Sequence, residues 1–134
     1  MRNSVAVRFL LAWMMLAGPA AAWSQESVTL RGEVIDPALY LREGRHGAEA
    51  EDLIFDAVDA GQTLALLEDG TQTVYLFLAG ESGEDPNDLL YEHVGRRVTV
   101  TGIVHERGGL KGIVPTAVEP SEPSSQPADT NTAQ

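Results

Sequence analysis

Three histidines, His46, His93 and His105, are the residues best suited to metal binding or proton transfer. No two of them stand three or four residues apart, the spacing that would put two metal ligands on one helix face. If the fold brings their loops together, His46 and His105 with Asp52 and Asp56 would offer a zinc or copper site. Solvated histidines are the commoner outcome, so a metal site is the alternative interpretation.

An acidic stripe is expected on the helix predicted over residues 49–60. Glu49, Asp52, Asp56 and Asp59 are spaced three, four and three residues apart there. Like charges at this spacing cost about a few tenths of a kcal/mol per pair. A divalent cation or a basic partner would relieve that repulsion, but an exposed face screened by salt does so more commonly. The stripe by itself therefore selects no ligand.

Nucleophilic catalysis has little support in the residues present. The chain has no cysteine, and residues 80–84 (GESGE) lack the final glycine of the G-x-S-x-G nucleophile elbow. Carboxylates are abundant, but no spacing selects one pair for acid–base work. We therefore expect a protein that is not an enzyme and that has no cofactor.

Aromatic and basic side chains give the expected ligand site. In the third predicted strand, Val74, Leu76 and Leu78 alternate with Tyr75 and Phe77. We expect the first three to face the core and the two aromatic rings to face a flat ligand, such as a sugar or a peptide. The alternative is that the acidic helix covers both rings. The predicted ligand-binding residues are Tyr40, Arg42, Arg45, His46, Tyr75, Phe77 and Arg107.

Five strands are predicted to position these residues. Alternation of apolar and polar residues places them at residues 28–35, 63–68, 71–79, 97–105 and 110–118. Asp69-Gly70 and Gly108-Gly109 are typical of hairpin turns. Pro115 indicates an edge or a bulge in the last strand.

Helices are predicted in two of the connections. Residues 37–48 look irregular, and the helix over 49–60 ends at Gly61. A second, short helix is predicted to begin after Asp85 as its N-cap and to run to about Val94.

This order of elements predicts a mainly β fold. It is that of a small five-stranded OB-like Greek-key barrel, with a helix in the connection of strands one and two and a short helix between strands three and four. Gly32 and Gly102 both lie in a V-T-x-x-G-x-V pattern. An inward glycine lets a long strand bend sharply in a small barrel. The alternative is two ordinary strands of a sandwich.

The span from Val28 to about Glu119 resembles a group of small exported bacterial OB-like proteins of unassigned function. The resemblance rests on residues 28–36 (VTLRGEVID), Tyr40-Leu41, the helix ending at Gly61, and residues 66–71 (LLEDGT), 74–76 (VYL) and 98–102 (VTVTG). Members of this group often carry a cysteine and a His-x-x-Cys-x-x-x-Cys run, at the places that Ala38, Ala50, Leu53 and Ala57 hold here. The resemblance thus implies the fold, and no soft-metal or disulfide chemistry at these positions.

Residues 1–22 have the features of a secretory signal peptide. Arg2 and Arg8 form a basic start, residues 9–18 are apolar, and three alanines at 20–22 suit a signal peptidase. The apolar run is short of the roughly 20 residues that span a bilayer, and no cysteine follows it for lipid attachment. We expect a periplasmic or secreted protein that is not a lipoprotein and has no membrane span after cleavage.

Charge and length narrow the remaining possibilities. Loss of the leader lowers the 9 basic residues to 7 against 20 acidic ones, a net charge near −13. Such a surface repels phosphate backbones, so no nucleic-acid partner is expected. Residues 23–119 are enough for one domain, and residues 120–134 have the Ser, Pro and acidic composition of a disordered tail.

The leading expectation is therefore a monomeric, non-enzymatic periplasmic module that binds a small ligand or an envelope protein. Two alternatives remain open: a divalent-metal-binding protein that uses His46, His105 and the acidic stripe, and a structural accessory subunit of an envelope complex.

Overall fold

The computed structural model describes residues 26–121, so the predicted leader and the predicted tail beyond Ser121 lie outside the described residues. The elements are β1 (Ser27–Ile35), α1 (Pro37–Glu43), η1 (Ala48–Ala50), α2 (Glu51–Asp59), β2 (Ala65–Glu68), β3 (Val74–Phe77), η2 (Tyr91–His93), β4 (Arg97–Arg107) and β5 (Leu110–Pro120). None of the helices in this part of the chain is both long enough and apolar enough to cross a bilayer.

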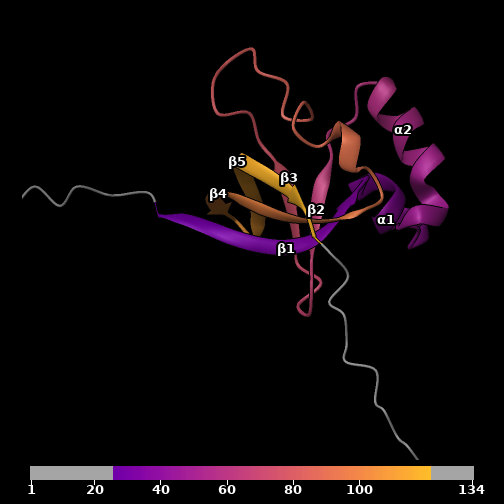
Figure 1. The fold of residues 1–134 in the computed structure, drawn as a ribbon, viewed down its shortest axis with the longest axis horizontal. Helices are drawn as coiled ribbons and strands as arrows, with labels where there is room; N and C mark the ends of the chain where they lie inside the picture. Colours follow the sequence, from indigo (N-terminus) through magenta and orange to yellow (C-terminus); the bar gives the residue numbers. More distant parts are fainter. Residues whose placement is uncertain (1–25, 122–134) are drawn as a thin grey trace, which may run out of the picture.

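The five strands form one closed barrel, in which the order around the wall is β1-β2-β3-β5-β4. Neighbouring strands pair antiparallel except β3 and β5, which pair in parallel through Leu76↔Gly112 and Phe77↔Ile113. Figure 1 shows α1 and α2 together beside the barrel, and the long connection between β3 and β4 rising above it. The prediction of a mainly β, five-stranded barrel is confirmed.

Two glycines sit where the barrel wall leaves no room for a side chain. A β-carbon built at Gly32 would lie 2.2 Å from the carbonyl oxygen of Leu67, and one at Gly102 would lie 2.2 Å from that of Val114. Gly32 and the next residue, Glu33, pair with both neighbours of β1, β2 and β4. The expectation that the two glycine positions can carry no β-carbon is confirmed, and it explains how the long strands β1 and β4 bend.

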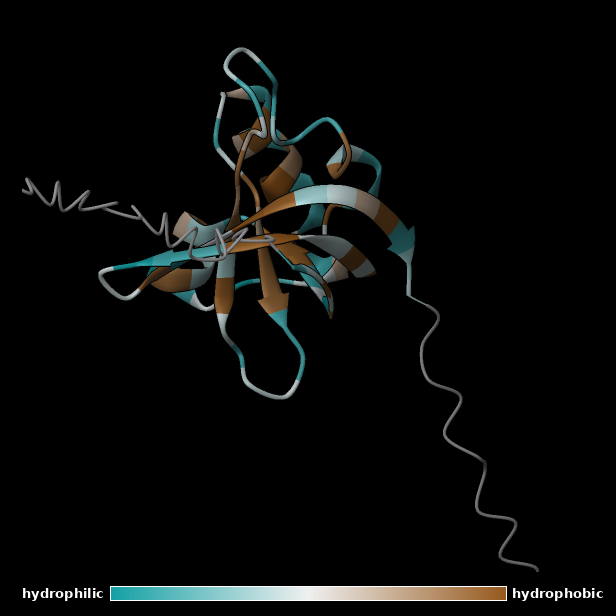
Figure 2. Cartoon of the chain, turned by 90° about the vertical axis from the view of Figure 1, so that its left-hand side faces the viewer, coloured by the Kyte–Doolittle hydropathy of each residue, from teal (hydrophilic) through white to brown (hydrophobic). Residues whose placement is uncertain are grey.

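The barrel interior holds the main core. Its largest fully buried side chains include Phe77, Leu66, Ile54 and Ile113, and strands β1 and β4 supply valines to it. Figure 2 shows apolar colouring on the strands and polar colouring at the loop tips. A second, smaller cluster lies outside the barrel wall, where Tyr40 of α1 packs with Ile35, Ala65, Leu67, Val74 and Leu76.

Of the edge or bulge predicted at Pro115, the structure has a bulge. The register of β4 against β5 shifts between Thr101 and Gly102, where Gly102 faces Pro115 but Thr101 faces Ala117. β5 continues to Pro120, beyond the predicted end at residue 118, because Glu119 and Pro120 still pair with β4.

The connection before β2 differs from the prediction. Residues 37–43 form helix α1 rather than an irregular segment. The Asp36 side chain caps this helix by accepting a 2.9 Å hydrogen bond from the backbone N–H of Leu39, Pro37 starts it, and Gly44 ends it with a φ of 68°. These are ordinary cap signals, which the glycines of the segment obscured.

The predicted helix from Asp85 to Val94 is wrong, because the structure has turns there and only the short 3-10 segment η2. Asp85 does accept a 2.9 Å hydrogen bond from the backbone N–H of Asn87, as a cap would. The side chain of Asn87 is buried, where it accepts a hydrogen bond from the Leu64 N–H and donates one to the Gln62 carbonyl, each 2.9 Å long. These tertiary bonds hold the segment against the start of β2 in place of a helix.

Candidate functional site

Tyr75 and Phe77 do not form the predicted ligand platform. Their side chains are 8% and 1% exposed and belong to the main core, whereas Val74 and Leu76 lie on the outer face of β3. The register explains this orientation, because Tyr75 faces the core residue Leu66 across the β2–β3 ladder. Both faces of β3 are apolar, so alternation could not reveal which face points inward. The predicted orientation of β3 is therefore corrected, and with it the accessibility of both rings.

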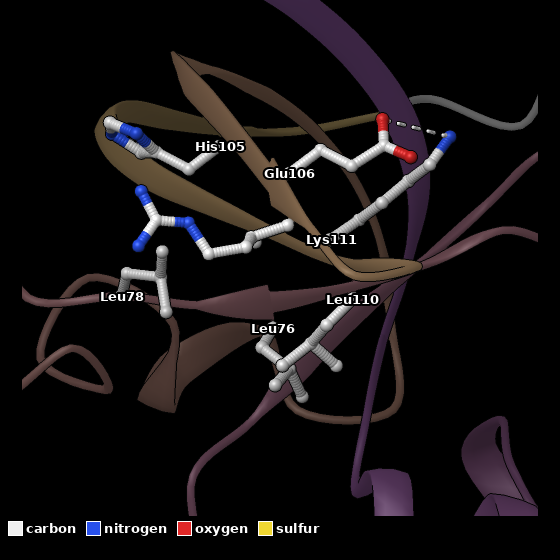
Figure 3. A pocket seen from close by; sticks show the side chains of 8 residues that line it. Leu76, Leu78, His105, Glu106, Leu110 and Lys111 are labelled. Carbon is white, nitrogen blue, oxygen red and sulfur yellow. Dashed lines mark ion pairs between the residues drawn. The ribbon is translucent and has the colours of Figure 1, made fainter.

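The outer face of β3 instead forms one wall of an open pocket of about 350 Å³ beside the β4–β5 hairpin. Its apolar lining comes from Leu76, Leu78 and Leu110, with Gly112 between them. Leu110 directly follows the Gly108-Gly109 turn and is 63% exposed. Figure 3 shows these leucines from close by. An apolar hollow of this size with charged groups at one end is a typical small-ligand site.

Gly112 determines the shape of this pocket. A β-carbon built at Gly112 would lie 2.6 Å from Cδ1 and 2.8 Å from Cγ of Leu78. The absence of that carbon therefore lets the Leu78 side chain lie directly against the strand. Any side chain at position 112 would push Leu78 into the pocket.

Two basic side chains lie on the same face as the leucines. His105 is the cross-strand partner of Gly112, and Arg107 is the partner of Leu110. Directly paired residues point to the same side of a sheet, so His105 and Arg107 border the apolar hollow that they help to line. Neither forms an ion pair with any residue between 26 and 121.

The intervening residues of the hairpin, Glu106 and Lys111, point to the other side of the sheet, since side chains alternate along a strand. Their charged groups pair at 3.9 Å, and Figure 3 shows this pair extending away from His105 and Leu78. Lys111 Nζ also lies 5.8 Å from the centre of the Tyr75 ring. Burial raises the pKa of the Tyr75 phenol, and the nearby carboxylate of Glu68 raises it further.

The other predicted ligand residues lie elsewhere, in the segment after β1. His46 Nδ1 is 3.1 Å from Glu33 Oε2, and the His46 ring meets the Tyr40 ring edge-on at 5.7 Å. Arg42 pairs with Glu43 at 3.5 Å. Arg45 and His46 line a shallow, mainly polar hollow with Gly44, Glu49 and Ala50. The structure thus separates Arg107 from Tyr40, Arg42, Arg45 and His46, which the sequence analysis grouped in one site.

The alternative metal site is not assembled. His46 and His105 line different hollows, and Asp52 and Asp56 are exposed on α2. Among residues 26–121, no three histidine or carboxylate side chains are placed to hold one metal ion. Asp59 of the acidic stripe accepts a 3.2 Å hydrogen bond from the Tyr91 hydroxyl, which raises the pKa of that phenol.

The pocket lined by Leu76, Leu78 and Leu110 is called the leucine pocket from here on. A second hollow, of about 450 Å³, adjoins it. The two hollows share Leu78, and the second continues past Ala79 toward Leu89 and Pro115. Leu89 is half exposed there. Glu84, Asp85 and Asp88 also line this second hollow, so Leu78 lies between an apolar hollow and an acidic one.

Sequence reasoning missed the leucines and Gly112 because it assigned Leu76 and Leu78 to the core. One signal was present in the sequence: the apolar residue Leu110 directly follows the Gly108-Gly109 turn. The structure shows that this leucine is exposed. The arrangement can hold an apolar group against β3 and a negative group at the hairpin. No family model, no curated protein and no solved structure matches this chain.

Proposed function

We propose that this chain is an exported, non-enzymatic binding module built on an OB-like Greek-key barrel. Its ligand is a small molecule whose apolar part lies in the leucine pocket between β3 and the β4–β5 hairpin. The basic start, apolar run and small-residue end of residues 1–22 support export.

Two features support the OB-like assignment. The wall order β1-β2-β3-β5-β4, with β3 and β5 parallel, favours a five-stranded Greek-key barrel. The two V-T-x-x-G-x-V segments both place a glycine where a β-carbon would meet a neighbouring carbonyl oxygen at 2.2 Å. In such folds the face around strands two and three and the loop between strands four and five are the usual places for ligands.

The observation that carries the binding proposal is the apolar lining of a pocket that opens to solvent. Leu76 and Leu78 are only partly buried, and Leu110 is mostly exposed, beside one another around Gly112. Covering such leucines with a ligand would remove apolar surface from water, at about 25 cal/mol per Å². Glu106, the one carboxylate around the pocket, points to the other side of the sheet and is paired with Lys111, so we assign binding rather than catalysis to the pocket.

Leucine-methyl NMR tests this proposal with a neutral probe, 1-octanol. We expect saturable shift changes at Leu76, Leu78 and Leu110. The exposed helical leucines Leu41 and Leu53 serve as internal controls, and their signals should stay unchanged. Equal changes at all exposed leucines, or no change at any, would remove the pocket as a ligand site.

A further inference from the structure

The charges around the leucine pocket are unusual for so acidic a chain. The whole sequence has 9 basic and 20 acidic residues, and one of its three histidines and one of its arginines lie on the leucine face of this pocket. Elsewhere, Arg42, Arg96 and Arg97 have carboxylate partners. Arg107 has no such partner between residues 26 and 121, and neither have Arg31 and Arg45, but of these three only Arg107 lines a pocket with exposed leucines.

We propose that the ligand is a linear alkyl carboxylate, with its head group at Arg107 and His105 and its hydrocarbon chain on the leucines. This inference rests on the proposed function and names the class of ligand for the same pocket. The guanidinium group of Arg107 can donate two parallel hydrogen bonds to one carboxylate. His105, on the same face two residues earlier, adds a second donor beside it.

The hydrocarbon chain of such a ligand can lie along the three leucines of the pocket. Gly112, the strand partner of His105, lies against Leu78, so the head group is at the Leu78 end and the hydrocarbon chain runs from there toward Leu76 and Leu110. The adjoining hollow beyond Leu78 is also lined by Glu84, Asp85 and Asp88, so it does not extend the site for an anionic ligand. Each added methylene group that becomes fully buried should tighten binding about fourfold.

An extended peptide suits the pocket less well. A bound peptide must satisfy its own backbone N–H and C=O groups. The side chains of the pocket wall are leucines and the ionisable groups of the hairpin, without asparagine, glutamine, serine or threonine. Polar contacts are therefore available at one end only, which fits an amphiphile with one charged head.

The negative net charge of the protein repels any anion. The attraction between Arg107 and the carboxylate head group must therefore be stronger than this repulsion. Charges farther apart than about 8 Å are largely screened at physiological salt, whereas Arg107 would touch the head group. Glu106, the nearest carboxylate of the hairpin, points to the other face and is paired with Lys111. The exposed contact with Arg107 should strengthen binding about two- to fivefold.

Isothermal titration calorimetry tests the inference with three probes of equal chain length: decanoate, 1-decanol and decyltrimethylammonium. We expect decanoate to bind most tightly and the cation most weakly. Arg107→Gln should weaken decanoate about two- to fivefold and leave 1-decanol unchanged. Arg45→Gln is the matched control, since it removes the same charge from the hollow near His46 and should change neither affinity.

The outcomes separate this inference from the proposed function. Equal or tighter binding of 1-decanol, with no effect of Arg107→Gln, would overturn the carboxylate while the leucine pocket still binds. Binding of none of the three probes would overturn both. Tighter binding of a trileucine peptide than of decanoate, or self-association of the protein that decanoate does not reverse, would assign the pocket to a peptide or to a second copy of the chain.

Discussion

The Leu78 side chain lies against Gly112 so closely that a β-carbon at Gly112 would stand 2.6 Å from Leu78 Cδ1. This contact joins β3 to β5 just where their parallel ladder, Leu76↔Gly112 and Phe77↔Ile113, holds the barrel closed. Both residues also line the leucine pocket. Shape of the site and closure of the barrel therefore depend on one position.

Gly112→Ala should make the leucine pocket smaller, because the added methyl group would push the Leu78 side chain into it. The added methyl group must displace the end of the Leu78 side chain, which can rotate outward, so we expect a stability loss of only about 1 to 2 kcal/mol. Binding of decanoate should weaken about tenfold or more. Calorimetry checks the affinity and urea denaturation checks the stability. In the Leu78→Ala background the added methyl group has no Leu78 side chain to displace, so Gly112→Ala should weaken decanoate binding much less there. An equal loss in both backgrounds would argue against this steric explanation.

Gly32→Ala and Gly102→Ala should be far more destabilising. At each position the new carbon would lie 2.2 Å from a backbone carbonyl oxygen, which cannot rotate away as a side chain can. We expect a loss of about 3 kcal/mol or more in the free energy of unfolding. Thr29→Ala, an exposed position on the same strand β1, is the control and should cost less than about 1 kcal/mol. Native-like stability of both glycine variants would contradict the assignment of these sites as the bends of the barrel.

Asn87→Ala should loosen the connection between β3 and β4 and the start of β2. It leaves the buried N–H of Leu64 and the carbonyl of Gln62 without their side-chain partner, at a cost of about 2 kcal/mol or more. Asn87→Asp keeps an acceptor for Leu64 but turns an oxygen toward the Gln62 carbonyl, so it should also be destabilised. Thermal unfolding measures both. The exposed neighbour Asp88→Ala should change stability little; an equal loss there would point to the loop in general.

Tyr75 should make the protein less stable in alkaline solution. Burial, with Glu68 nearby, raises the pKa of the Tyr75 phenol above its ordinary value of 10.0. The unfolded chain therefore loses this proton first, so the contribution is fully present below about pH 10 and is lost as the pH rises toward the folded pKa. Tyr75→Phe keeps the ring and removes the phenol, so its stability should fall less steeply above pH 10. Urea denaturation at several alkaline pH values checks the slope, and identical slopes would exclude this effect.

The sequence was sufficient for the barrel because several local signals agreed. The alternation in β1 and β4, the hairpin turns and the repeated glycines all indicate the same architecture, and Gly32 and Gly102 occupy the predicted tight positions. Pro115 was likewise informative, since it lies at the register shift of β5. Such agreement between local patterns is what makes a fold readable from sequence.

The site was less predictable for a physical reason. β3 carries apolar residues on both faces, so the inward face is decided by its pairing with β2 and by the interior space that Tyr75 and Phe77 fill. The wrong prediction of a helix near Asn87 has the same kind of cause. Asp85 does form the hydrogen bond of a helix cap, but the long-range hydrogen bond between Asn87 and Leu64 determines the conformation. Of the predicted ligand residues, only Arg107 lines the leucine pocket with its side chain.

An isotope-filtered NOE spectrum of the labelled protein with unlabelled decanoate tests the account most directly, because it reports which side chains touch the hydrocarbon chain. The account predicts cross-peaks from the ligand methylenes to the methyl groups of Leu76, Leu78 and Leu110, and weaker ones in Gly112→Ala. Cross-peaks to Leu41 or Leu53 on the helices instead, or none at saturating decanoate, would contradict it.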